Sequence, residues 1–247
     1  MAAFRLGPEP RAMTTTFDMM PVAIVEGCYP DKFGVPRQPG LASSATARLV
    51  LQPPFDTADA LRGLEDFSHV WLTFVFHRNP TAWHALVRPP RLGGNRKVGV
   101  FASRATHRPN RIGLSLVEIA GIERTPHPTI IIRGHDLVDG TPVLDIKPYL
   151  PWSDSVDNAR AGFAPAPPPQ YAVIYSEAAR KTLATRPDGD ALVTLINDVI
   201  AQDPRPAYHR GNTERLYGVR LRDIDVKFRE TVLDGQCTLK IVAIDTP

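Results

Sequence analysis

Proline restricts the fold of this chain more than any other residue type. The sequence of 247 residues contains 25 prolines, about twice the usual share of ~5%. Proline removes a backbone donor and interrupts helices, whereas strands joined by irregular loops accommodate it. We therefore expect a β-rich chain with few long helices.

Six short apolar runs carry the sequence pattern of strands. They are rich in Val, Ile, Thr and aromatic residues and are bounded by Gly, Pro or Asn, which is typical of strands. Little helix separates them; only the run at 58–67 predicts a short helix, weakened by Gly63. This pattern predicts an antiparallel sheet or a small barrel. The expected strands lie at 21–26, 46–52, 70–76, 98–103, 115–122 and 129–133.

A proline-rich segment, APAPPP at 164–169, divides the chain, because consecutive prolines favour a stiff extended spacer. After it, apolar residues at helical spacing predict an amphipathic helix over 192–200, which Asp203-Pro204 ends. Strand-like alternation follows at 216–221, 224–228 and 239–243. The expected organisation is a disordered leader at 1–16 (with Met13 as an alternative start), a β domain at 17–163, a linker at 164–169 and a small α+β domain at 170–247.

The distribution of charge points to an anionic partner. The formal net charge is only +3, yet no Asp or Glu occurs between Phe67 and Val117, where eight Arg or Lys residues are found. Folded soluble proteins normally intersperse the two signs of charge. This basic block therefore favours nucleic acid or a phosphorylated ligand as the partner. A solvated basic face without a partner is the alternative.

Several classes of protein are excluded by what the sequence lacks. No apolar run is long enough for a transmembrane helix, and residues 1–16 have no apolar core of a signal peptide. Cys28 and Cys237 lie too far apart for a disulfide framework or a cysteine-based zinc finger, and they fit a reducing cytoplasm. No glycine-rich dinucleotide motif or P-loop is present, and we expect neither a metal nor a membrane.

Long composite motifs connect the sequence to a known family. The motifs are KFGVPRQPGL at 32–41, GLEDFSHVWLTFVFH at 63–77, RPPRLGG at 88–94, GVFASRATHRPNRIGLSLVE at 99–118, DLVDGTPVLDIKPYLP at 136–151 and AQDPRPAYH at 201–209. With these motifs, over about residues 18–247, the chain resembles the TrmO (TsaA-like, YaeB) family.

The resemblance implies a fold and an activity. Family members are S-adenosylmethionine-dependent tRNA methyltransferases with a single-sheeted antiparallel β-barrel as catalytic domain, and they act as homodimers. They methylate N6 of the threonylcarbamoyl-adenosine at position 37 (t6A37 to m6t6A37), just 3′ of the anticodon, in threonine tRNA. The β-rich pattern and the missing dinucleotide motif agree with such a fold.

The resemblance also implies a cofactor site. Gly40 allows the backbone to approach a ligand closely, and Arg104 is able to bind a carboxylate with two hydrogen bonds. The residues implied to hold S-adenosylmethionine are Pro39, Gly40, Leu41, His77, Arg78, Arg104, Leu114, Asp136, Gly140 and Thr141.

The acceptor nitrogen needs a group that takes its proton. N6 of threonylcarbamoyl-adenosine is a ureido nitrogen, whose lone pair is delocalised into the neighbouring carbonyl and the purine. A positioned general base typically contributes about 10²–10⁴-fold. Asp139, Asp136 and His77 are the candidates, because they lie in or beside the implied cofactor loops. For Asp139, a structural role in an Asp-Gly turn is the alternative.

The basic residues supply candidates for tRNA binding. Arg37, Arg108 or Lys147 is suited to the threonyl carboxylate, and Arg88, Arg91 and Arg96 to phosphates. Phe33, Tyr149 and Trp152 are candidates for stacking on bases, whereas Trp71 is expected in the core. A second group contains Arg205, Tyr208 and Arg210, with His209 and Arg215 nearby, and is suited to tRNA or to a dimer contact.

Two other functions remain open from the sequence. A non-catalytic RNA-binding module would use the basic face and bind no S-adenosylmethionine. A small-molecule methyltransferase would keep the cofactor pocket without the RNA, although it would not require the acid-free basic block.

Overall fold

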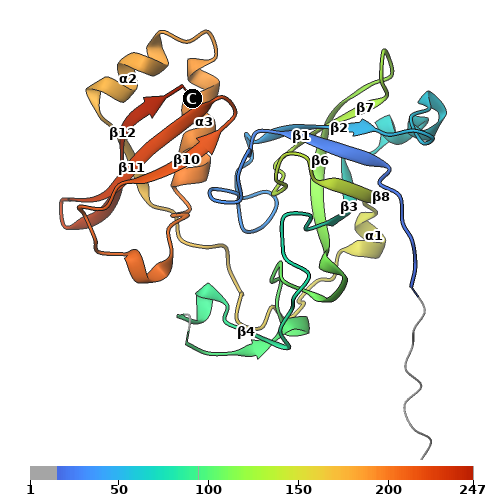
Figure 1. Ribbon diagram of the computed structural model, residues 1–247, viewed down its shortest axis with the longest axis horizontal. Coiled ribbons are helices and arrows are strands. Elements are labelled where there is room, and N and C mark those ends of the chain that lie inside the picture. Colours follow the sequence, from blue (N-terminus) through green and yellow to red (C-terminus); the bar gives the residue numbers. More distant parts are fainter. Residues whose placement is uncertain (1–15, 94, 247) are drawn as a thin grey trace, which may run out of the picture.

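The computed structural model describes residues 16–93 and 95–246. The leader expected at 1–16 lies outside these residues, except for Thr16. The chain forms two parts, a β-barrel and a smaller domain of one sheet and two helices, joined by an extended linker (Figure 1). No helix in the described ranges is long and apolar enough to span a membrane.

Six strands close into an antiparallel barrel in the order β1-β2-β7-β6-β3-β8. Their side chains alternate between the interior and the outer face, as the strand pattern predicts. For example, Val25 pairs with Leu49, which pairs with Ile130, and all three are fully buried. The strands are β1 (Ala23–Gly27), β2 (Thr46–Leu51), β3 (His69–Val75), β6 (Ile112–Glu123), β7 (Thr129–Arg133) and β8 (Pro142–Pro148).

Two local predictions in the barrel domain are wrong. The run at 98–103 is a strand only at β5 (Val98–Gly99) and then turns into η4 (Val100–Ala102), because the ribbon that it forms with β4 (Leu86–Val87) is two residues long. The expected helix at 58–67 is split into η1 (Ala58–Leu61) and η2 (Leu64–Asp66). Gly63 separates these turns with a left-handed φ of 83°, which ends helical winding.

The remaining short elements of this domain are η3 (Pro90–Leu92), η5 (Pro109–Arg111) and α1 (Pro151–Asp154). Proline occupies the first turn of each, where its missing N–H costs no hydrogen bond. The abundance of proline thus produces short turns between strands.

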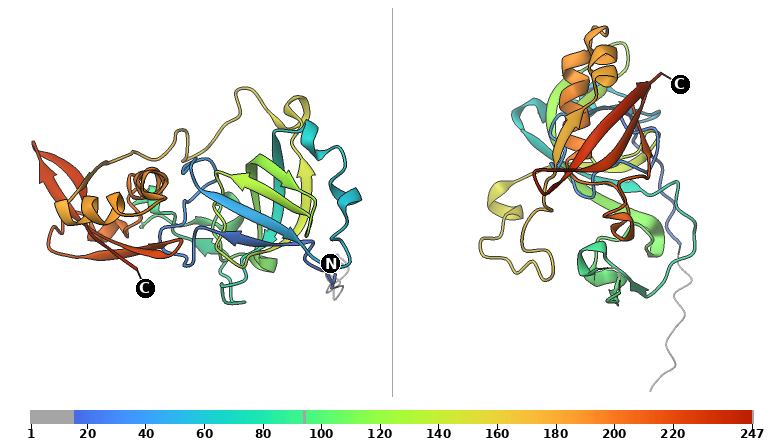
Figure 2. Two further views of the ribbon diagram at one scale, coloured as in Figure 1. Left: turned by 90° about the horizontal axis from the view of Figure 1, so that it is seen from above. Right: turned by 90° about the vertical axis from the view of Figure 1, so that its left-hand side faces the viewer.

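The C-terminal domain is a four-stranded sheet of order β10-β11-β12-β9 with helices α2 and α3 (Figure 2). The predicted apolar stripe of α3 is buried in the core of this domain. The sequence pattern missed β9 and α2, which are short; Ser176 caps α2 by accepting a hydrogen bond from Ala179 N–H. The elements are β9 (Ala172–Tyr175), α2 (Glu177–Ala184), α3 (Gly189–Ile200), η6 (Ala207–His209), β10 (Tyr217–Leu221), β11 (Ile224–Leu233) and β12 (Gln236–Asp245).

The long loop between β1 and β2 packs against the C-terminal domain. Its residues Tyr29 and Ala42 belong to the same buried cluster as α3 and the C-terminal sheet. Gly34 in this loop has a left-handed φ of 96°, and a Cβ there would lie 2.5 Å from Val219 Cγ1 of β10. Ser44 donates a 2.7 Å hydrogen bond to Asp198 of α3. This loop is therefore held between the two domains.

Candidate active site

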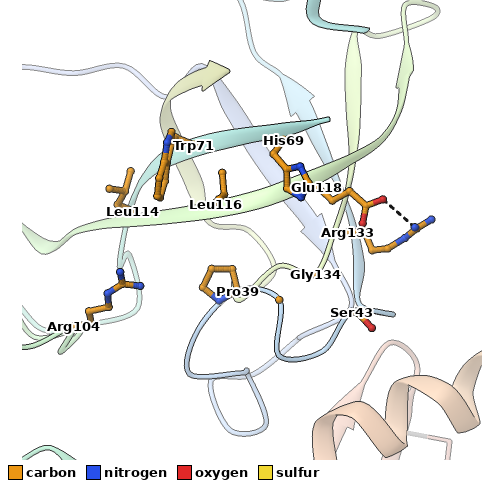
Figure 3. A pocket seen from close by; sticks show the side chains of 11 residues that line it. Pro39, Ser43, His69, Trp71, Arg104, Leu114, Leu116, Glu118, Arg133 and Gly134 are labelled. Carbon is orange, nitrogen blue, oxygen red and sulfur yellow. Dashed lines mark hydrogen bonds and ion pairs between the residues drawn. The ribbon is translucent and has the colours of Figure 1, made fainter. Parts of the chain in front are cut away.

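A cavity of about 430 Å³ lies on the outer face of the barrel, against β3 and β6 (Figure 3). Strand alternation places its wall: Val70, Leu72 and Val117 point inward, so the residues beside them point out. The strand register then sets outward residues opposite each other, with His69 facing Glu118 and Trp71 facing Leu116. The lining residues are Pro39, Gly40, Ser43, His69, Trp71, Arg104, Leu114, Leu116, Glu118, Arg133 and Gly134.

The β1–β2 loop forms the opposite wall of this cavity. Gly40 N–H donates a 2.7 Å hydrogen bond to the carbonyl of Gly134, which fixes the loop above the end of β7. Gly40 has a φ of 78°, and a Cβ at this position would meet no atom within 4 Å. The glycine is therefore required by its backbone conformation, and it leaves peptide backbone exposed to a ligand.

The charged groups of the cavity lie at its rim. Arg104 donates a hydrogen bond to the side-chain carbonyl of Gln38, next to Pro39. Arg133 and Glu118 form a half-exposed ion pair with a nitrogen–oxygen distance of 3.1 Å. Breaking such an exposed ion pair costs little free energy, so Arg133 and Glu118 are able to contact a ligand instead.

A partly buried carboxyl lies behind this wall. Ser115, which points inward between Leu114 and Leu116, donates a 2.6 Å hydrogen bond to Asp136 Oδ1. Burial raises the pKa of Asp136 to about 6, while the hydrogen bond and the charge of Arg104 act in the opposite direction. Asp136 is therefore mostly ionised at pH 7 but poorly solvated, which makes it a stronger proton acceptor than an exposed aspartate.

The structure divides the predicted cofactor residues into two groups. Pro39, Gly40, Arg104 and Leu114 line the cavity. Leu41 is half-buried next to it and accepts a hydrogen bond from Gln202 through its carbonyl.

The other predicted cofactor residues do not line this cavity. Arg78 donates a 3.3 Å hydrogen bond to the carbonyl of Asp139. Gly140 lies beside His77, since a Cβ at this glycine would be 3.9 Å from His77 Nε2. Thr141 is buried and donates to a loop carbonyl.

Asp139 makes the contacts of a turn residue. Its Oδ1 accepts a 2.9 Å hydrogen bond from Gly27 N–H, and its own N–H donates to the carbonyl of Tyr29. It borders a second groove, of about 440 Å³, together with Arg48 and Arg222. His77 is half-buried; burial first and the charge of Arg78 second lower its pKa, so the imidazole is neutral at pH 7.

Trp71 is not a core residue, and the sequence expectation for it is wrong. It is half-buried, faces the cavity, and donates a 3.0 Å hydrogen bond from Nε1 to Asp154. Tyr149 lies beside it with 6.2 Å between ring centroids, and Trp152 nearby in the chain is 84% exposed. The alternation of buried Val70 and Leu72 is the signal that would have placed Trp71 outside. Other lining residues that the sequence analysis missed are Ser43, His69, Leu116, Glu118, Arg133 and Gly134.

The predicted tRNA contacts have different surroundings. Arg108 is half-buried and donates a 2.8 Å hydrogen bond to the carbonyl of Ser103, so it holds its own loop. Lys147 is exposed, is bonded to Asp145, and pairs across the strands with Trp71 of the cavity. The candidates with exposed side chains are Arg37, Arg88, Arg91, Arg96, Tyr208 and Arg210.

Arg205 is a correction to the prediction. Its side chain is completely buried and forms ion pairs with Asp203 and Glu230 at 2.6 and 2.7 Å. A buried guanidinium that is fully engaged by carboxylates has no surface to offer to RNA. Tyr208 and Arg210 of the same motif are exposed and remain candidates for contact with RNA.

Comparisons with known proteins agree with this architecture. Residues 24–155 match the family model of the tRNA-methyltransferase O N-terminal domain, and residues 168–246 match that of the TrmO C-terminal domain. The chain is 47% identical over 222 residues to the tRNA (adenine(37)-N6)-methyltransferase of Escherichia coli K12, covering 88% of this chain and 94% of that protein.

A human tRNA (adenine(37)-N6)-methyltransferase is 46% identical over 141 residues, which are 56% of this chain and 31% of the human protein. A crystal structure of TrmO from Pseudomonas aeruginosa superposes with a TM-score of 0.78 and 41% identity, covering 96% of this chain and all of that one. The barrel, the C-terminal domain and these likenesses together show that the chain belongs to the TrmO family of S-adenosylmethionine-dependent tRNA (adenine(37)-N6)-methyltransferases.

Proposed function

We propose that this enzyme transfers a methyl group from S-adenosylmethionine to N6 of threonylcarbamoyl-adenosine at position 37 of a threonine tRNA. The observation that supports it most is the cavity on β3 and β6, with Arg104 at its rim and the partly buried carboxyl of Asp136, whose pKa is raised, behind its wall. This arrangement offers a ligand site next to a desolvated proton acceptor.

The cavity suits the chemistry of S-adenosylmethionine. Its volume of about 430 Å³ is in the usual range for small-molecule sites, roughly 300–1,000 Å³. Trp71 and Leu116 offer an apolar wall for the adenine, and an aromatic ring also attracts a sulfonium cation. Arg104 suits the carboxylate of the cofactor, and the exposed backbone at Gly40 offers hydrogen bonds. When bound, the cofactor supplies an electrophilic methyl group on its sulfonium.

The protein must assist the loss of the N6 proton. A carbon–nitrogen bond forms as the carbon–sulfur bond breaks, and the proton of N6 leaves to a base. Asp136 is the best of the predicted candidates, because it is ionised at pH 7, poorly solvated and adjacent to the cavity wall. His77 is neutral and thus able to accept a proton, whereas the carboxylate of Asp139 is occupied by Gly27 N–H.

Lys147 is the best placed of the three residues proposed for the threonyl carboxylate. It pairs across the sheet with Trp71, which lines the cavity, and its bond to Asp145 lies at the exposed surface. Exposed ion pairs contribute little and exchange readily. The neighbouring rings of Tyr149 and Trp152 suit a splayed-out base of the anticodon loop.

We further propose that the enzyme works as a homodimer in the cytoplasm. Leu86 of β4 and Phe101 of η4, which directly follows β5, are large apolar side chains that are more than half exposed. Exposed apolar patches of this kind are typical of protein–protein contacts.

Methyl transfer from labelled S-adenosylmethionine to two tRNA pools tests this proposal. One pool carries the threonylcarbamoyl group, and the other comes from cells that lack it. Label only in the first pool is the expected result. Label in both would remove the requirement for the ureido group, and label in neither would contradict tRNA as acceptor and favour a small-molecule acceptor.

A further inference from the structure

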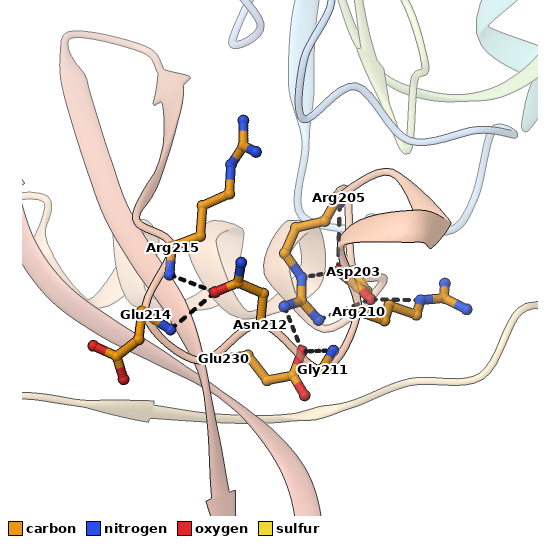
Figure 4. Close-up of polar contacts among 8 residues, drawn as sticks. All are labelled: Asp203, Arg205, Arg210, Gly211, Asn212, Glu214, Arg215 and Glu230. Atoms are coloured by element: carbon orange, nitrogen blue, oxygen red, sulfur yellow. Dashed lines mark hydrogen bonds and ion pairs between the residues drawn. The ribbon is translucent and has the colours of Figure 1, made fainter.

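A buried ion-pair network fixes one loop of the C-terminal domain (Figure 4). Arg205 donates from Nε and Nη2 to the two oxygens of Asp203 at 2.6 and 3.1 Å, and from Nη1 to Glu230 of β11 at 2.7 Å. Glu230 also accepts a 2.9 Å hydrogen bond from Gly211 N–H, and Arg210 donates to Asp203 at 3.0 Å. Both ends of the loop 203–211 are therefore tied to one buried charge cluster.

The loop presents an exposed aromatic ring and an exposed cation. Tyr208 is 83% exposed, with its ring 4.4 Å from that of His209. Arg210 is bonded through Nε to Asp203, which leaves its terminal nitrogens without a partner among the described residues.

The β1–β2 loop, which carries Arg37, contacts the start of this loop, because Gln202 donates a 3.0 Å hydrogen bond to the carbonyl of Leu41. Partial burial lowers the pKa of Arg37, and the like charges of Arg210 and Arg91 lower it further, against the effect of Asp203. Arg91 of η3 donates a 2.6 Å hydrogen bond to the carbonyl of Ala166 in the linker, and the linker then reaches this region, where Tyr171 N–H donates a 2.8 Å hydrogen bond to the carbonyl of Ala201. Arg37 therefore lies within electrostatic reach of both Arg210 and Arg91.

The positive charge of this cluster is not compensated. In the described part of the chain, Arg37 and Arg91 have no carboxylate within 4.0 Å. Asp203 raises the pKa of Arg37, but it already forms ion pairs with both Arg205 and Arg210. Mutual repulsion of like charges is unfavourable unless an anion joins them.

The cluster is also connected to the candidate cofactor cavity. Arg37 precedes Gln38, which accepts a hydrogen bond from Arg104, and Pro39 and Gly40 line the cavity. An anion held by Arg37 would therefore lie beside the place where the methyl group is transferred.

We propose that Arg37, Arg91 and Arg210 form one clamp for the phosphate backbone of the tRNA, spanning both domains, and that Arg205 is its positioning residue. The proposal rests on tRNA as the substrate. Guanidinium groups suit phosphate oxygens because they donate paired hydrogen bonds. Tyr208 lies two residues from Arg210 and offers a stacking surface for a base next to the clamped phosphate.

Binding of threonylcarbamoyl-bearing threonine tRNA at 50 and 200 mM KCl tests the clamp. The variants are Arg37→Ala, Arg91→Ala and Arg210→Ala, and the control is Arg180→Ala, an exposed arginine of α2. One phosphate contact contributes roughly a three-fold loss of affinity over this range of salt. Between 50 and 200 mM KCl, the affinity of each clamp variant should therefore fall by about three-fold less than the affinity of the wild type falls. The affinity for S-adenosylmethionine, measured by calorimetry, should stay unchanged.

Arg205→Lys tests the positioning role in the same assays. Lysine keeps the charge but lacks the planar fork that binds Asp203 and Glu230 together. We expect KM for tRNA to rise several-fold with kcat retained. A loss of kcat with unchanged KM would show that Arg205 acts in some other way.

The outcomes separate this proposal from the proposed function. Clamp variants with the salt dependence of Arg180→Ala would overturn the clamp, even if methyl transfer proceeds normally. Binding that loses its salt dependence in the clamp variants, without methyl transfer by the wild type, would support the clamp and refute the reaction. A change in sedimentation mass of the variants, with tRNA binding intact, would assign the cluster to a protein contact and overturn the proposal.

Discussion

Replacing Arg205 by methionine measures how much the buried ion-pair network contributes to the free energy of unfolding. Methionine fills a similar volume but removes the charge between Asp203 and Glu230, which are 0% and 5% exposed. Removing one partner of a buried ion pair typically costs about 3–5 kcal/mol. Asp203 keeps Arg210 at 3.0 Å and Glu230 keeps Gly211 N–H at 2.9 Å, so we expect the lower end, about 3 kcal/mol.

The destabilisation should depend on pH. Burial by itself raises the pKa of Glu230, but the hydrogen bonds from Arg205 and Gly211 outweigh it and the pKa is lowered. A lowered folded-state pKa stabilises the wild type above the unfolded value, and this contribution is lost as pH falls through the folded-state value. In Arg205→Met burial dominates, so protonation of Glu230 relieves the unpaired charge. The difference between wild type and variant should therefore shrink as pH falls from the raised pKa of Glu230 in the variant toward the lowered pKa in the wild type.

Thermal unfolding followed by circular dichroism measures this effect at pH 7 and at pH 4. For a chain of this size, about 3 kcal/mol corresponds to a loss of roughly 6–12 °C in Tm. Arg229→Met, an exposed position on the same strand β11, is the control and should change the free energy of unfolding by less than about 0.5 kcal/mol. A loss below about 1 kcal/mol at pH 7 would refute our account of the network, as would a loss that is the same at both pH values.

Three further changes test the site and the domain junction. Asp136→Asn should slow methyl transfer yet stabilise the fold at pH 7 by about 2–3 kcal/mol. The pKa of Asp136 is raised to about 6, so the wild type gains stability as pH falls through this value. Unchanged denaturant unfolding of the variant would contradict the desolvation of this carboxyl. Arg104→Ala should weaken S-adenosylmethionine binding about ten-fold in calorimetry, the worth of one charge-assisted contact; full affinity would remove Arg104 from the cofactor site. Gly34→Ala should cost about 2–4 kcal/mol in denaturant unfolding, because its φ of 96° and a Cβ 2.5 Å from Val219 Cγ1 are both unfavourable. Gly99→Ala, where a Cβ meets nothing within 4 Å, is its control, and equal effects of the two would disprove the clash.

The periodic parts of the fold were predictable from the sequence. Alternating apolar residues predicted five of the six barrel strands, and the helical stripe predicted α3. The sixth barrel strand, β8, was missed. These patterns depend on which side of one element is buried, so a local window of sequence contains the information. Two composite motifs also carried cavity residues, Pro39 and Gly40 in one and Arg104 and Leu114 in the other. Short elements such as β9 and α2 carry too little pattern to be recognised.

Contacts between distant segments were decided by the tertiary structure. Trp71 faces the cavity rather than the core because β3 is closed into a barrel in which Val70 and Leu72 fill the interior. Arg205 reads as a surface cation in the sequence, yet it is buried because Asp203 and Glu230, which is 25 residues away, neutralise it.

The tertiary structure also decided which of the predicted cofactor residues line the cavity and which do not. The cofactor motifs are continuous in sequence, but docking of the β1–β2 loop on Gly134 brings Pro39 to the cavity that Arg104 also lines. Hydrogen bonds with Gly27 and Tyr29 instead hold Asp139 in a turn. Residue types and their spacing determined the strands, the basic character and the family of this chain. Which charges meet depends on barrel closure and domain docking, since these bring together groups that no local sequence pattern relates.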